Sequence, residues 1–201
     1  MYQLKPLILP VLATTLIVVA SNILVQIPFA HWNMQDNLTW GAFTFPISYL
    51  ITDLTNRRYG SATARKLVAV GFVLAVLASL YFATPRIAVA SGLAYVCGEL
   101  LDISVFNRLR RQAWWHAPLA ASLIGSALDT ALFFTIAFAG DADMSVAVPF
   151  SLMPGHMVPL WENLALWDFG VKCVVALLAL IPYGAFLKAV MPVDASLPVK
   201  I

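Results

Sequence analysis

Long apolar stretches separated by short polar segments run through the whole chain. A helix needs about 20 mostly apolar residues to cross a membrane. Six stretches approach that length, at residues 7–27, 40–55, 67–83, 87–106, 118–139 and 167–188. The first could be a cleaved signal peptide, but its apolar run continues as far as Pro28, and we interpret it as a membrane helix. The pattern predicts an all-α membrane protein, a single polytopic domain over residues 1–201 with six transmembrane helices.

Two segments depart from this simple pattern. The second stretch is short, and Pro46 interrupts it. A proline frees backbone groups that must find partners in protein or water, so broken membrane helices commonly line a cavity. The segment 140–166 is long, apolar and rich in proline. We expect it to lie in the membrane interface or to fold over the bundle.

Composition supports the membrane assignment. Hydrophobic residues make up 61% of the chain and charged residues 11%, whereas soluble domains have about 45–50% and about 25%. So few charged side chains cannot cover a soluble globule of 201 residues. The two cysteines fall in apolar stretches and lack the spacing of a metal site. We predict no metal, no cofactor and no nucleic-acid partner, and the sequence leaves open whether the chain forms a homo-oligomer.

The positions of lysine and arginine predict the orientation. If the N-terminus is cytoplasmic, ten of the 12 cations fall in cytoplasmic segments and only Arg86 falls in an outer one. Cytoplasmic loops of membrane proteins carry such an excess of cations. We therefore expect both termini inside, in a multi-pass membrane protein. The ten cations are Lys5, Arg57, Arg58, Arg65, Lys66, Arg108, Arg110, Arg111, Lys188 and Lys200.

Polar side chains at the middle and in the outer halves of the stretches form a candidate substrate-binding site. They are Asn22, Gln26, Asp129, Asp168 and Lys172. Each ionisable group costs about 2.5–3.5 kcal/mol to insert, so such groups point to function. Asp129 has no partner on its own helix, and Lys172 is the candidate to neutralise it. As alternatives, Asp168 and Lys172 form a local pair four residues apart, and the two amides join helices.

Two aromatic residues of the broken stretch extend this candidate site. Phe45 and Tyr49 are four residues apart, so they share one face of a helix. Their rings provide a stacking wall for a flat ligand, or else they pack in the core. In the fifth stretch, the small residues Ser122, Gly125 and Ser126 favour close packing against a neighbouring helix.

A second charged group lies in the inner halves of the stretches. Asp53 and Arg57 are four residues apart and can pair on one helix face. Asp102 precedes the basic segment that contains Arg108. We interpret these four residues as ion pairs that lock the inner ends of the helices. The alternative is an inner gate whose pairs break and reform.

The sequence carries no signature of an enzyme: it has no nucleophile elbow, zinc-protease motif, P-loop or dinucleotide fingerprint. A helical bundle with a buried polar site accessible from outside favours a small-molecule carrier. Two alternatives stay open. One is the substrate-binding subunit of an ATP-driven importer of vitamins or nucleobases, and the other is a membrane protein without a transport function.

Several segments resemble the vitamin uptake transporter family, over nearly the whole chain. They include SNILVQ at 21–26, WGAFTFP at 40–46, TDLT at 52–55, VFNRLR at 105–110, WW at 114–115 and AP at 117–118. The resemblance implies import of 7-cyano-7-deazaguanine and 7-aminomethyl-7-deazaguanine, precursors of the transfer-RNA nucleoside queuosine. It also implies a fold like the six-helix substrate-binding subunits of energy-coupling-factor transporters. An acidic residue that many members carry is replaced here by Arg57, so that role does not transfer.

Overall fold

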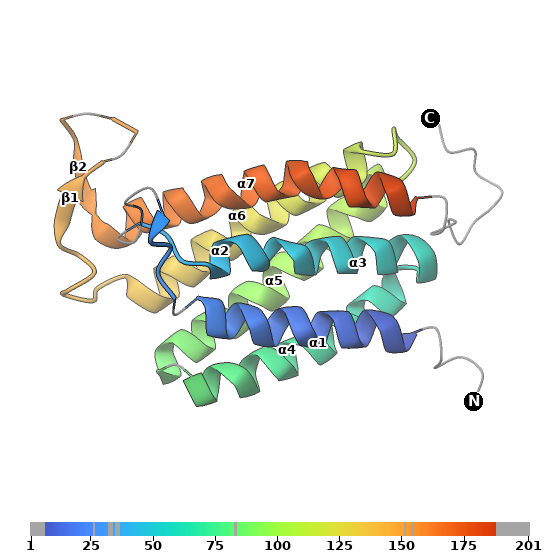
Figure 1. The fold of residues 1–201 in the computed structure, drawn as a ribbon, viewed down its shortest axis with the longest axis horizontal. Coiled ribbons are helices and arrows are strands. Elements are labelled where there is room, and N and C mark those ends of the chain that lie inside the picture. The colour runs from blue at the N-terminus through green and yellow to red at the C-terminus, as the bar shows by residue number, and fades with distance from the viewer. Residues whose placement is uncertain are drawn as a thin grey trace.

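The computed structural model describes residues 7–25, 27–31, 34, 37–82, 84–150, 152–153 and 155–187. It is mostly helical, with one short antiparallel hairpin (Figure 1). The helices are α1 (Ile8–Leu24), α2 (Gly41–Thr44), α3 (Pro46–Tyr59), α4 (Ser61–Phe82), α5 (Pro85–Leu109), α6 (His116–Phe138) and α7 (Leu160–Phe186). The strands are β1 (Ala147–Pro149) and β2 (Met157–Pro159).

Four of the helices are long and apolar enough to cross a membrane: α4, α5, α6 and α7. Helix α1 is apolar but has only 17 residues, which is about 26 Å at 1.5 Å per residue. Large apolar side chains stay exposed along α1, α4 and α7, for example Leu16, Leu77 and Ile181. A soluble protein rarely exposes such a surface. The fold is that of an all-α membrane protein.

The helix boundaries differ from the predicted ones mainly in two places. Helix α4 begins at Ser61 rather than at residue 67, because Gly60 at φ 82° ends α3 and the next helix starts at once. Helix α7 begins at Leu160, inside the segment predicted as a loop. The rest of that segment includes the β1–β2 hairpin, which projects beyond the ends of α6 and α7 (Figure 1). The predicted end of the last stretch, Lys188, lies outside the described residues.

Pro46 divides the second predicted stretch into α2 and α3. It is the first residue of α3, where its missing N–H costs no hydrogen bond. Phe45 ends α2 and precedes α3 with helical backbone angles, φ −58° and ψ −42°. The two helices therefore follow each other closely.

Helix α3 lies in the middle of the bundle, where it packs against α1, α4, α5, α6 and α7. It is also more polar than α1, α4, α5, α6 and α7, and several of its polar side chains are buried. They are Ser48, Thr52, Asp53, Thr55, Asn56 and Arg57. Because α3 lies in the interior, protein and not lipid surrounds these polar side chains, as polar groups at membrane depth require.

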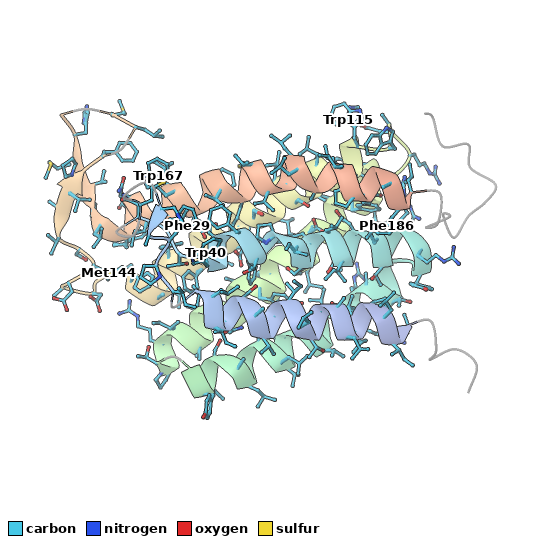
Figure 2. All side chains as sticks on the ribbon, viewed as in Figure 1. Phe29, Trp40, Trp115, Met144, Trp167 and Phe186 are labelled. Carbon is cyan, nitrogen blue, oxygen red and sulfur yellow. The ribbon has the colours of Figure 1, made fainter. Side chains whose placement is uncertain are left out.

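The bundle has two distinct ends. At one end of the bundle α1 begins and α3, α5 and α7 end (Figure 1). We call it the basic end, because the helix termini there carry Arg57, Arg58, Arg65, Lys66 and Arg108. The other, the hairpin end, carries the β1–β2 hairpin and the segment that precedes α2. Trp40 and Trp167 lie toward the hairpin end and Trp115 at the basic end (Figure 2). Tryptophans at both ends match the aromatic belts of membrane proteins.

Candidate functional site

A cavity of about 620 Å³ lies among the helices toward the hairpin end. Small-molecule sites measure about 300–1,000 Å³. Residues from α1, α2, α4, α5, α6 and α7 line it, together with the segment before α2. Its lining includes Ser21, Asn22, Asn37, Leu38, Ala42, Phe45, Ser79, Ser91, Ala94, Asp129, Phe133, Phe134, Phe138, Asp168 and Lys172.

A lysine between two carboxylates forms the charged part of the cavity wall. Lys172 Nζ lies 2.7 Å from Asp129 Oδ2 and 2.6 Å from Asp168 Oδ2. Thr130 joins them, since its hydroxyl accepts from Lys172 Nζ at 2.9 Å and donates to Asp168 Oδ2 at 2.8 Å. Lys172 and Asp129 are buried, whereas Asp168 is partly exposed. Two carboxylates share one cation, so the three groups carry a formal charge of −1 when all are ionised.

Both ion pairs agree with the sequence analysis. Asp168 and Lys172 pair within α7, and Asp129 on α6 finds Lys172 as its partner from another helix. Lys172 also lies over the ring of Phe45, with Nζ 5.4 Å from the ring centroid. A cation over an aromatic face is attracted by the ring. Phe45 therefore belongs to the same wall as the charged group.

An amide and a hydroxyl from the other side of the cavity complete its polar lining. Ser79 on α4 donates to Asn22 Oδ1 at 2.6 Å, and Asn22 Nδ2 donates to the carbonyl of Val18 at 2.9 Å. These bonds fix the orientation of the Asn22 amide. Because Asn22 lines the cavity as well, it presents a positioned polar group opposite the acids of α6 and α7. The prediction that it joins helices is also met, through Ser79.

The segment before α2 borders the cavity toward the hairpin end. Pro28 and Thr39 form a bridge that holds its two arms together. Phe29 packs with Trp40 and Phe43, with ring centroids 4.9 and 5.0 Å apart. Asn37, Leu38 and Thr39 line the cavity, and Asn163 of α7 donates to Asn37 Oδ1 at 3.2 Å. This segment contributes directly to the site.

Two predicted substrate residues do not appear in the lining. Tyr49 is fully buried and is not part of the lining, which agrees with the alternative that it packs in the core rather than stacking on a ligand. The ring packs instead against Gly98 and Gly125, the closest approach of α5 and α6. Gln26 lies outside the described residues.

The predicted inner ion pairs are wrong. Among the described residues, no ion pair joins Asp53 to Arg57 or Asp102 to Arg108. The Arg57 guanidinium lies over the rings of Phe106 and Tyr183, at 5.8 and 5.9 Å. Arg108 is exposed, while Asp102 is fully buried. Six residues along a helix turn a side chain to a different face, so the spacing cannot bring Asp102 and Arg108 together.

Asp53, Glu99 and Asp102 instead form a carboxyl cluster between the cavity and the basic end. Each has at most 1% of its surface exposed. The Asp53 and Asp102 carboxyl groups lie within hydrogen-bonding reach of each other. Glu99 Oε1 lies 2.7 Å from the Ser48 hydroxyl. We use the name carboxyl cluster for these three residues below.

Other residues of the site were not predicted. Thr130 stands next to Asp129 in the sequence, so a hydroxyl beside a buried acid was the available signal. Ser79 and Ser91 are single small polar residues in apolar stretches, and such residues usually serve only helix packing. Their place in the cavity follows from how α4 and α5 pack, which the sequence pattern does not contain.

The fold and the cavity define a multi-pass helical membrane protein with a polar site of solute size in its interior. The chain matches the family model described as "Putative vitamin uptake transporter" over residues 39–84 and 79–186. It belongs to the vitamin uptake transporter family, as the resemblance predicted. The members of this family named below are transporters and not enzymes, and in bacteria such proteins lie in the inner membrane.

Three relatives match over most of their length. The chain is 35% identical to the "Queuosine precursor transporter" of Escherichia coli (strain K12), over 88% of this chain and 84% of the relative. It is 35% identical to the "Probable queuosine precursor transporter" of Haemophilus influenzae, over 87% and 83%. A protein of the same name from Bacillus subtilis is 24% identical, over 78% and 74%. No solved structure matches the chain.

Proposed function

We propose that this protein imports queuosine precursors, 7-cyano-7-deazaguanine and 7-aminomethyl-7-deazaguanine, across the bacterial inner membrane. Three of its relatives are named queuosine precursor transporters, two of them at 35% identity. The observation that carries the proposal is the cavity wall in which Asp129 and Asp168 share Lys172. The wall offers more carboxylate oxygens than its single cation occupies.

The chemistry of a deazaguanine suits this wall. Its pyrimidine edge presents neighbouring N–H donors, and one carboxylate can accept two of them at once. Its carbonyl oxygen accepts, and either Lys172 or the Asn22 amide can donate to it. Its flat ring suits a wall of aromatic side chains, to which Phe45, Phe133 and Phe134 contribute. In this arrangement Asp129 and Asp168 recognise the ring edge and the phenylalanines hold the ring faces.

The topology in this proposal has six membrane crossings, with the basic end in the cytoplasm. The four long helices supply four of these crossings. Helix α1 supplies the fifth, and α2 and α3 together supply the sixth. The short α3 is surrounded by other helices, so its length need not match the lipid. Clustered cations at the basic end support the orientation. The kinship with energy-coupling-factor subunits and the formation of a homo-oligomer stay predictions.

Transport needs the cavity to open alternately to the two sides. Toward the hairpin end the cavity is bordered by the loop before α2. Toward the basic end, Tyr49, the carboxyl cluster and Tyr183 fill the interior. The conformation seen here is therefore closed to the cytoplasm, and release requires α3 to separate from α5 and α7.

Uptake of labelled 7-cyano-7-deazaguanine tests this proposal. The host should lack its own precursor synthesis and its own transporter, and variants should be compared at equal membrane abundance. We expect Asp129→Asn to lower the initial rate at low substrate by about tenfold or more, because a hydrogen bond to a charged group is worth about 1.5–3 kcal/mol. Glu162→Gln changes an exposed acid of α7 and serves as the matched control. If Asp129→Asn transports as well as this control, the site is misassigned.

A further inference from the structure

The carboxyl cluster is the largest concentration of buried charge that the substrate site does not use. Asp53 and Asp102 face each other from α3 and α5, and Glu99 lies one turn from Asp102. Three ionised carboxylates in a low-dielectric interior repel one another strongly. Arg57 is the buried cation beside them, and it rests on aromatic rings rather than on a carboxylate.

Asp53 and Asp102 lie close enough for their carboxyl groups to share a proton. Neither oxygen of Asp102 has a hydrogen-bond donor among the described residues, and Asp53 Oδ1 has none either. A hydrogen bond between two carboxyl groups exists only if one of them is protonated. Asp53 and Asp102 thus form a pair that can hold one proton between them and release it.

Unpartnered hydroxyl groups lead to this pair from two sides. Tyr49 Oη is fully buried and has no hydrogen-bond partner among the described residues. Its ring is flanked by Asp102 Cβ and Asp129 Cβ where α5 and α6 meet, so it stands between the substrate site and the cluster. On the other side, Tyr183 Oη is equally buried and has no partner in the part of the chain that the structure describes, and it lies near Asp53, Asp102 and Arg57. Hydroxyls with no fixed partner can both accept and donate a proton.

The groups that face the Asp53–Asp102 pair come from α3, α5, α6 and α7. Helix α3 contributes Tyr49 and Arg57, and α5 contributes Glu99. Helix α6 contributes Asp129, which acts on Tyr49 and Glu99, and α7 contributes Tyr183. Arg110, after the end of α5, also acts on Tyr183. In space, these groups form a series from Asp129 through Tyr49 to the Asp53–Asp102 pair, which runs from the cavity toward the basic end.

We propose that Asp53 and Asp102 form a proton-binding site that couples substrate uptake to proton entry. This inference rests on the proposed transport function. A carboxylate of the pair takes up a proton from the side of the substrate cavity, with Tyr49 as the relay, and becomes a carboxylic acid. The same proton leaves to the cytoplasm past Tyr183 when the basic end opens. Protonation removes one negative charge from the pair, which lowers the cost of moving α3 relative to α5.

The test measures proton movement and substrate binding separately in proteoliposomes of the purified full chain. A pH dye inside the vesicles reports proton entry when 7-cyano-7-deazaguanine is added outside, and a substrate-induced thermal shift reports binding. We expect the wild type to show both signals. Asp102→Asn and Asp53→Asn, which preserve size, should keep the thermal shift and lose the proton signal by about tenfold or more. Glu162→Gln is the control that should keep both.

Three results separate failure of this inference from failure of the transport function. If both variants admit protons as the wild type does, the pair is not the proton site. If the wild type binds and exchanges labelled substrate but moves no protons, or responds only to an imposed sodium gradient, proton coupling is overturned and transport stands. If the wild type shows no thermal shift and no exchange of labelled substrate, the proposed function itself fails.

Discussion

Replacement of Lys172 by methionine should abolish substrate binding and destabilise the protein at the same time. The substitution leaves Asp129 buried without its cation and deprives Thr130 and Asp168 of theirs. Breaking a buried pair on one side costs about 3–5 kcal/mol, since a charge remains without compensation. We expect a markedly lower melting temperature in detergent and no measurable thermal shift with 7-cyano-7-deazaguanine.

Two further variants make this result specific. Lys66→Met is the same substitution at an exposed lysine of α4 and should change neither property. The triple variant Asp129→Asn, Asp168→Asn, Lys172→Met removes all three charges, so it should regain much of the lost stability while binding stays absent. A single Lys172→Met variant as stable as Lys66→Met would show that the charged wall is not held together as described.

Gly98→Ala should destabilise the protein, because an added methyl group has no room where α5 and α6 meet. A Cβ built at Gly98 would lie 2.5 Å from Tyr49 Oη, 3.0 Å from Asp129 Cβ and 3.1 Å from the Gly125 carbonyl oxygen. Helices α5 and α6 touch through their backbones here, so they must move apart. Overpacking of this kind costs about 1–3 kcal/mol. Because Asp129 and Tyr49 are displaced together, substrate affinity should fall as well.

Gly170→Ala is the matched control on the outer face of α7. A Cβ there meets no atom within 4 Å. Alanine is favoured over glycine in a helix by about 0.5–1 kcal/mol, so this variant should be slightly more stable than the wild type. Melting temperatures of the two variants in the same detergent should move in opposite directions. Equal shifts would contradict the close contact of α5 and α6.

The sequence was enough to predict those features that depend on local pattern and on the cost of burial. Apolar length predicted the long helices, and the break at Pro46 predicted a helix beside a cavity. Asp129 was predicted to find Lys172 because a carboxylate at that depth needs a partner from another helix. The small residues around Gly125 predicted close packing, which occurs against α5.

The inner cluster could not be predicted, because it depends on how helices pack. The spacing of Asp53 and Arg57 allows an ion pair, but Phe106 and Tyr183 from two other helices offer the guanidinium an aromatic site. Asp102 meets Asp53 only through the contact of α3 with α5. Sequence spacing describes one helix at a time. For the same reason the sequence leaves open whether Tyr49 lines the cavity or packs in the core, where its ring lies.

Binding of 7-cyano-7-deazaguanine to the purified protein tests the central claim most directly, because it needs neither a gradient nor a host. Thermal unfolding should be followed with and without the compound, in the wild type and in Ser91→Phe, which places a large ring in the cavity. At 100 times the dissociation constant, binding adds about 2.7 kcal/mol to the stability of the folded state. We expect a clear upward shift for the wild type and none for Ser91→Phe. No shift in the wild type, or equal shifts in both proteins, would contradict a substrate site in this cavity.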